Sequence, residues 1–226
     1  MTNLLEKNEP YYLKIYSIIK EKIFNGTFQP GEKIIESQLS KEFKVSKSPV
    51  REAIRILENE GLIVVKNTRL YVYEASVKDI KEVYAFRAAI ESYTTRYFTE
   101  FATDKDIEDL KNSLVQVEKL IEQEASNASI IEENIKFHRI ILNKSGNEIL
   151  IRHYKIINAL INYYRNKNIS GDQRPNEILK QHREIFNFIN KRDSDNAEKR
   201  MIKHLKQDVE HLFEILDIDS SIDTII

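Results

Sequence analysis

The chain has 226 residues, contains no cysteine and balances 35 lysines and arginines against 36 aspartates and glutamates. A chain of this length forms one large domain or two ordinary ones without covalent cross-links, and the missing cysteines exclude disulfide scaffolds, thiolate metal sites and thiol nucleophiles. A net charge of -1 points to no particular partner, so partners have to be inferred from where the charges lie.

Low glycine and proline content is the next informative feature of the composition. Only 5 Gly and 4 Pro occur, alongside 31% charged residues, which favours helices joined by short connections. The first residues lack the basic start and apolar run of a signal peptide, and no segment approaches about 18 consecutive apolar residues. We therefore expect a soluble, mainly α-helical, cytoplasmic protein with no membrane partner.

The N-terminal third of the chain predicts three helices followed by a small β-hairpin. Apolar residues at helical spacing, with Ser, Pro and Gly at the ends, mark the helices. Runs of β-branched and aromatic residues mark the two strands. The helices are expected over residues 10–25, 35–43 and 46–59, and the strands over residues 62–65 and 70–73. This order of elements is typical of a winged helix-turn-helix.

After Glu74 the strand patterns stop and only helices are predicted. Capping boxes at Ser76 and Thr103 begin the first two of them. The expected helices cover residues 76–101, 103–125, 129–144, 147–167, 175–191 and 194–216. Six helices without a strand predict a bundle. The boundary near Ala75 divides the chain into a winged helix-turn-helix domain, residues 1–75, and an all-α domain, residues 76–226.

Basic residues gather on the face of the third helix that would meet a DNA duplex. Residues 41–55 include five basic side chains and two acidic ones. Lys47, Ser48 and Arg51 lie near the start of the helix, where free backbone N–H groups favour phosphate. There Arg51 can reach a guanine edge, while Lys47 and Ser46 are suited to phosphate. From spacing alone, a solvated charged face explains these residues equally well.

Particular residues in this segment resemble a known family. The run Ser46-Lys47-Ser48-Pro49-Val50-Arg51-Glu52-Ala53, followed by Glu60-Gly61-Leu62, is similar to the DNA-binding domain of GntR-type regulators, over about residues 10–75. The resemblance implies double-stranded operator DNA as a partner, with Ser46, Lys47, Ser48, Arg51 and the wing residue Arg69 as DNA-binding residues. The chain departs from the family at two positions. Lys47 stands where the family usually has Arg, so the planar guanidinium that forms paired hydrogen bonds is missing. Leu70 stands where the family usually has Gly, so the wing cannot adopt a positive φ freely at this residue.

Four of the five histidines share apolar helical stripes in the C-terminal half. They are His138, His153, His182 and His204, and Asn134 lies one turn before His138. A lone histidine on such a stripe is more often a satisfied core residue than a ligand. Several on separate helices favour a metal site, because imidazoles and one oxygen can surround a divalent ion inside a bundle. Spacing does not choose among the four histidines.

A second resemblance makes that choice. The segments Phe86-Arg87-Ala88-Ala89-Ile90-Glu91, Asn134…Phe137-His138, Gln181-His182-Arg183-Glu184-Ile185 and Met201-Ile202-Lys203-His204-Leu205 are similar to the all-α effector domain of the FadR-like branch of the same family. Metal-containing members supply Asp, less often Asn, and three His. The resemblance thus implies Asn134, His138, His182 and His204 as ligands of a divalent metal, zinc ahead of nickel or manganese, and no ligand role for His153 or His211.

Arg87 matches the arginine that anchors the effector in this branch. The match implies a small carboxylate effector, because a guanidinium binds a carboxylate through paired hydrogen bonds. From the residues alone, a surface salt bridge with Glu91, one turn further on, is an equal explanation.

The combined prediction is a GntR-type repressor with a metal-assisted carboxylate pocket and no enzymatic activity. We expect a homodimer, formed through the helical bundle, because two recognition helices must meet successive major grooves about 34–36 Å apart. A metal-free sensor of a longer apolar ligand stays open, because Asn134 in place of Asp weakens the site. A metal-dependent hydrolase is the enzyme alternative; against it, no Asp or Glu is placed beside the histidines with the regularity that a general base needs.

Overall fold

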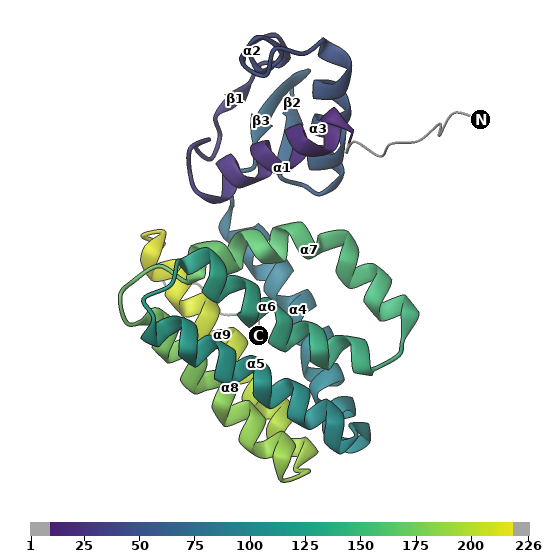
Figure 1. Cartoon of the computed structure of the whole chain (residues 1–226), viewed down its shortest axis with the longest axis vertical. Helices are drawn as coiled ribbons and strands as arrows, with labels where there is room; N and C mark the ends of the chain where they lie inside the picture. The colour runs from purple at the N-terminus through teal and green to yellow at the C-terminus, as the bar shows by residue number, and fades with distance from the viewer. Residues whose placement is uncertain (1–9, 219–226) are drawn as a thin grey trace, which may run out of the picture. The chain divides into compact units, whose positions relative to one another are not determined.

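The structure is a computed structural model that describes residues 10–218. Its contacts divide the chain into two compact units, Met1–Ala75 and Ser76–Ile226 (Figure 1). The predicted fold class is confirmed: the chain is mainly α, with a winged helix-turn-helix followed by a helical bundle. Across residues 10–218, no helix combines the length and the apolar character needed to cross a membrane.

The first unit contains the expected helices and hairpin together with one additional strand. Its elements are α1 (Tyr11–Phe24), β1 (Lys33–Ile34), α2 (Glu36–Glu42), α3 (Lys47–Asn59), β2 (Ile63–Lys66) and β3 (Arg69–Val72). The strands form an antiparallel sheet in the order β1-β3-β2. β1 was not predicted, because two residues are too few to display the alternation of a strand. α1 packs against α3, burying Ile19 and Leu57 completely.

The wing turns at Asn67 and Thr68, whose φ angles are 49° and 62°. Two successive residues in this left-handed region form the two-residue turn that matches the twist of a hairpin. Leu70 lies beyond this turn, within β3 and opposite Val65. The residue that replaces the family's usual glycine therefore occupies a strand position, where the left-handed region is not needed.

The second unit consists of six helices over its described residues. They are α4 (Val77–Phe101), α5 (Asp104–Glu122), α6 (Asn127–Lys144), α7 (Glu148–Asn168), α8 (Arg174–Asn190) and α9 (Ser194–Ile215). Both predicted capping boxes are present: Ser76 and Thr103 accept hydrogen bonds from the backbone N–H groups three residues on. α4 packs against α6, α7, α8 and α9, so side chains from these helices meet in one interior.

Candidate functional sites

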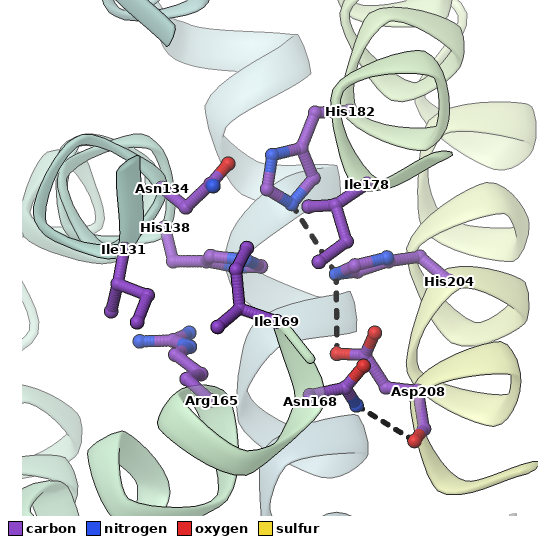
Figure 2. Close-up of a pocket in the computed structure, with 10 residues that line it drawn as sticks. All are labelled: Ile131, Asn134, His138, Arg165, Asn168, Ile169, Ile178, His182, His204 and Asp208. Carbon is purple, nitrogen blue, oxygen red and sulfur yellow. Dashed lines mark hydrogen bonds and ion pairs between the residues drawn. The ribbon is translucent and has the colours of Figure 1, made fainter. Parts of the chain in front are cut away.

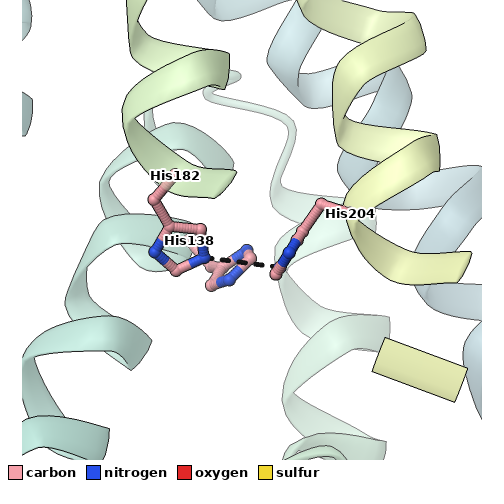
Figure 3. Close-up of side chains that lie close together, drawn as sticks. All are labelled: His138, His182 and His204. Atoms are coloured by element: carbon pink, nitrogen blue, oxygen red, sulfur yellow. Dashed lines mark hydrogen bonds between the residues drawn. The ribbon is translucent and has the colours of Figure 1, made fainter. Parts of the chain in front are cut away.

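Three imidazoles from three helices meet inside the second unit. His138 belongs to α6, His182 to α8 and His204 to α9, and all three are buried. One ring nitrogen from each lies within 4.8 Å of the others, and the Nε2 atoms of His182 and His204 are 3.3 Å apart. Figure 3 shows the three rings pointing toward one another. Nitrogen atoms this close on separate helices are the arrangement of a metal site.

The fourth predicted ligand lines the same cavity. Asn134 lies on α6, one turn before His138, and is buried. Its side-chain N–H group donates to the Ile130 carbonyl, whereas Oδ1 has no hydrogen-bond partner in the described residues. A buried acceptor left unpaired costs about 1–3 kcal/mol, so it favours a cation or a water molecule beside it.

The other two histidines lie away from this cluster. His153 is exposed on α7 and its Nδ1 lies 2.8 Å from the Ile149 carbonyl. His211 contacts the Ser170 carbonyl and Glu214. The structure thus brings together the three histidines that the resemblance selected, together with Asn134, and leaves the remaining two outside.

Burial keeps the three imidazoles neutral. Desolvation lowers the pKa of His138 from 6.5 to about 4, and the nearby Arg165 guanidinium adds to the effect. Desolvation, followed by neighbouring imidazoles, holds the pKa of His182 and of His204 well below 6.5. At neutral pH each ring therefore has a nitrogen lone pair, which is the form that binds a metal.

Polar partners on the far side of two rings orient them. His138 Nδ1 lies 2.7 Å from Glu91 Oε2, and His204 Nδ1 lies 2.7 Å from Gln181 Oε1. Asp208 Oδ2 is 3.7 Å from His204 Nε2. Metal-binding histidines usually donate their second N–H to an oxygen; His204 has such a partner in Gln181, whereas the contact of His138 with Glu91 is a close approach without hydrogen-bond geometry. Two carboxylates, from Glu91 and Asp208, therefore lie beside the histidines in the folded chain.

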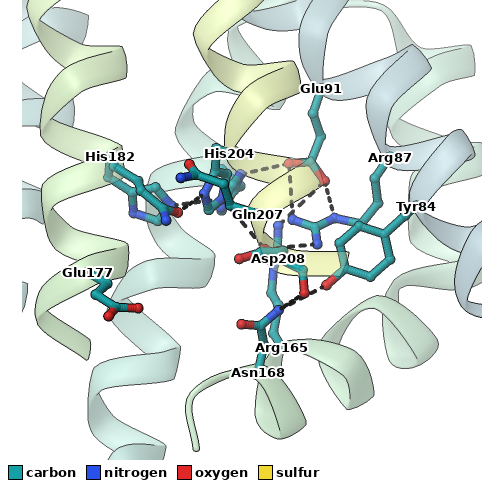
Figure 4. Close-up of polar contacts among 12 residues, drawn as sticks. Tyr84, Arg87, Glu91, Arg165, Asn168, Glu177, His182, His204, Gln207 and Asp208 are labelled. Carbon is teal, nitrogen blue, oxygen red and sulfur yellow. Dashed lines mark hydrogen bonds and ion pairs between the residues drawn. The ribbon is translucent and has the colours of Figure 1, made fainter. Parts of the chain in front are cut away.

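Arg87 lies in a buried network of charges behind the cavity (Figure 4). Its Nε donates to Glu91 over 2.8 Å, and its Nη1 lies 3.5 Å from Asp208 Oδ2. The predicted salt bridge with Glu91 is present, but its predicted surface location was wrong, because Arg87 is 0% exposed. The described residues that line the cavity do not include Arg87.

The network fixes the charge of Glu91. Burial alone raises the pKa of this carboxyl, but Arg87, His138 and Arg165 hold it well below its usual value. The Glu91 carboxylate thus accepts hydrogen bonds from Arg87 and from the Tyr154 hydroxyl.

The cavity itself is small and includes a cation that the sequence analysis missed. Its volume is about 30 Å³, and Arg165 and Asp208 line it beside Asn134 and the histidines (Figure 2). Asp208 follows His204 by one helical turn, a spacing that is visible in the sequence. Arg165 gave no comparable signal, because it follows two buried tyrosines and its ion pair is with Glu91, which is far away in the sequence.

The predicted DNA-binding residues are all exposed in the first unit. Lys47, Ser48 and Arg51 lie in the first turns of α3, Ser46 precedes it as the N-cap, and Arg69 begins β3. Glu36 of α2 was not predicted to take part, yet its Oε2 accepts a hydrogen bond from Arg51 Nε over 2.9 Å. The Arg51 side chain is still 57% exposed, so its guanidinium is accessible.

Two family models match consecutive parts of the chain. Residues 11–69 match the model described as bacterial regulatory proteins, gntR family, and residues 82–207 match the FCD domain. The first segment contains the exposed basic residues of α3 and the wing. The second contains Asn134 and the three clustered histidines.

Named relatives extend over nearly the whole chain. The HTH-type transcriptional regulator YdhC of Bacillus subtilis is 36% identical over 214 residues, which cover 94% of this chain and 96% of the relative. The HTH-type transcriptional repressor RspR of Escherichia coli is 28% identical over 204 residues, 90% of this chain and 89% of the relative.

Solved structures share the fold at low sequence identity. The Escherichia coli protein McbR/YncC superposes with a TM-score of 0.72 at 18% identity, covering 92% of this chain and 99% of that one. A GntR transcriptional regulator structure from Rhodococcus sp. RHA1 gives 0.73 at 18% identity, covering 91% and 97%. These relatives and structural neighbours are transcriptional regulators, not enzymes.

Proposed function

Because the chain belongs to the GntR family of transcriptional regulators and carries the FCD domain, we propose that it is a repressor controlled by a small carboxylate. GntR regulators bind operator DNA, and FCD domains bind small-molecule effectors. We further propose that the effector site holds a divalent metal, with zinc preferred over nickel or manganese.

In the proposed DNA complex, the exposed start of α3 enters the major groove. Arg51 contacts a guanine edge, while Lys47, Ser46 and Ser48 contact phosphate. Arg69 at the base of the wing contacts the adjacent minor groove or backbone. Exposure of all five side chains supports these roles, since none must leave a buried position to reach DNA.

The observation that carries the metal proposal is the buried cluster of neutral imidazoles beside an unpaired amide oxygen. One ring nitrogen from each of His138, His182 and His204 lies within 4.8 Å of the others. Asn134 lines the same cavity, and its Oδ1 is buried without a hydrogen-bond partner in the described residues. This donor set suits zinc, nickel or manganese. When bound, such a metal supplies a Lewis-acidic centre that attracts a carboxylate oxygen.

Arg165, in place of the predicted Arg87, is the arginine that we assign to the effector. Arg165 is among the described residues that line the histidine cavity, and Arg87 is not. Arg87 is held between Glu91 and Asp208 and acts as a positioning residue for the Glu91 carboxylate, which contacts His138.

Two other functions fit the site less well. A long apolar ligand would face Arg165, Asp208 and the imidazoles, which form a polar lining. A hydrolase would use the carboxylates of Glu91 and Asp208 beside the histidines, but the relatives of this chain are regulators.

Elemental analysis of the purified full-length protein tests the metal proposal. The wild type is expected to hold about one zinc, nickel or manganese ion per chain, and His182→Gln to lose it. His153→Gln is the matched control, because it removes an exposed imidazole outside the cluster. A folded wild type without metal, and without a thermal shift on adding these ions, would contradict the proposal.

The homodimer is tested separately on operator DNA. Two recognition helices on one duplex face require two-fold symmetry and half-sites about one helical turn apart. We expect a dimer in analytical ultracentrifugation and a two-fold symmetric footprint. A monomer at micromolar concentration, with and without operator, would contradict it.

A further inference from the structure

A second cavity lies between α6 and α7, and it shares only Arg165 with the histidine cavity among the described lining residues. Its volume is about 400 Å³, within the range of about 300–1,000 Å³ typical of small-molecule sites. This space is much larger than the histidine cavity, whose volume is about 30 Å³.

The charge of this α6–α7 cleft is positive. Arg139 comes from α6, Lys155 and Arg165 come from α7, and none of the described residues that line the cleft is acidic. Arg139 and Lys155 are exposed and make no ion pair with any described residue. Arg165 is partly compensated, because its Nη2 lies 3.6 Å from Glu91 Oε1. Two uncompensated cations facing one hollow favour an anion.

The cleft also offers neutral groups that an inorganic ion would not use. Asn158, Asn162 and the Tyr154 side chain line it, with isoleucine and leucine side chains between them. Asn162 Oδ1 is buried without a hydrogen-bond partner in the described residues, and so is Arg165 Nε. The unpaired oxygen accepts from a hydroxyl group, whereas the unpaired N–H donates to an anion.

We propose that the α6–α7 cleft binds a hydroxylated organic anion, either a sugar phosphate or a sugar acid. Arg139 and Lys155 bind the charged group at the mouth, Arg165 Nε donates at the base, and Asn162 Oδ1 accepts from a ligand hydroxyl. This site goes beyond the proposed effector site and does not depend on a metal.

Isothermal titration of the full-length protein tests the cleft with three probes: glucose 6-phosphate, gluconate and glucose. At least one of the two anions is expected to bind, and neutral glucose is expected not to. The two anionic probes distinguish a phosphate ester from a carboxylate. Absence of heat and of thermal stabilisation with both anions would overturn the proposal.

A pair of substitutions at the mouth locates the binding. The double variant Arg139→Gln, Lys155→Gln should bind the anion about tenfold or more weakly than the wild type, because each substitution removes a charge-assisted hydrogen bond. Lys105→Gln with Lys119→Gln is the matched control: both lysines are exposed on α5 and outside the cleft. If both double variants bound the anion as tightly as the wild type, the assignment to this cleft would be wrong.

Metal content measured on the same samples separates this proposal from the metal proposal. Neither Arg139 nor Lys155 lines the histidine cavity, so their double variant should keep the metal content of the wild type. A metal-free wild type that binds the anion supports the cleft and contradicts the metal site. A metal-loaded wild type that binds neither anion contradicts the cleft alone.

Discussion

Arginine occupies opposite environments in the two units. Arg51 of the first unit extends from α3 with 57% of its side chain exposed and one carboxylate partner, Glu36. Arg87 of the second unit is 0% exposed and lies between Glu91 and Asp208. An exposed ion pair contributes little to stability and is free to exchange partners, whereas breaking a buried one is costly because it leaves a charge without compensation. The charge of Arg51 in the first unit is therefore accessible to a partner, whereas the charge of Arg87 in the second unit is paired inside the core.

Histidine follows the same division. All five histidines lie in the second unit, and three of them are buried there. The described part of the first unit has no group with an ordinary pKa near neutrality. Differences in the response of the two units to mutation and to acid therefore test whether buried charge defines the second unit.

The largest effect is expected from Arg87→Ala. Removing the guanidinium breaks the buried 2.8 Å ion pair with Glu91, while Asp208 keeps its ion pair with Arg174; the loss should destabilise the protein by about 3–5 kcal/mol. Urea unfolding followed by circular dichroism measures the loss.

Arg96→Ala is the control for that variant. Arg96 lies on the same helix, α4, and pairs with Glu100, Asp195 and Glu198 at a partly exposed position. Its loss should cost much less than that of Arg87, because solvent screens exposed ion pairs. Equal costs for the two variants would remove the distinction between buried and exposed charge.

Acid should weaken the second unit before the first. The pKa of His138 falls from 6.5 to about 4 on burial, so between these pH values the unfolded chain binds a proton at His138 and the folded chain does not. Stability is therefore complete above about pH 6.5 and falls between pH 6.5 and pH 4, by about 3 kcal/mol for this residue. His182 and His204 act in the same direction.

Hydrogen exchange resolved by peptide, with a chelator present, measures this loss. Protection in α6, α8 and α9, corrected for intrinsic rates, should fall over that pH window while protection in α1 and α3 stays constant. A parallel fall in both units would show that buried histidines do not govern the acid response.

Much of the fold was predictable because its signals are local. Capping boxes at Ser76 and Thr103 and apolar periodicity placed every helix to within a few residues. The missed strand, β1, exists only through its pairing with β3. A two-residue strand has no pattern of its own.

The candidate site was predictable only in part. Resemblance supplied Asn134 and the three histidines, which the structure brings to one cavity. Spacing showed that Arg87 and Glu91 are one turn apart, but it could not show that helices on every side bury them. Arg165 was missed for the same reason, since its ion pair with Glu91 comes from another helix, α4.

Arg51→Ala tests the exposed charge of the first unit. The substitution should cost about 1–3 kcal/mol of operator affinity and relax specificity at one base pair, with little change in stability. Fluorescence anisotropy with operator and mutated operator measures both. Lys14→Ala, an exposed charge on α1, serves as the control. Unchanged sequence preference in Arg51→Ala would show that α3 does not read the bases through this residue.

Lys47→Ala is expected to have the smallest effect, and it differs in kind from Arg51→Ala. Lys47 is exposed in the first turn of α3, and an ammonium group contacts phosphate as a point charge, without the planar fork that discriminates bases. Its loss should weaken binding to every sequence by the same factor and reduce the slope of log affinity against log salt by about one. Titrations on operator and unrelated duplex at several salt concentrations measure the slope. A change confined to the operator would assign Lys47 to base recognition and leave phosphate contact to other residues.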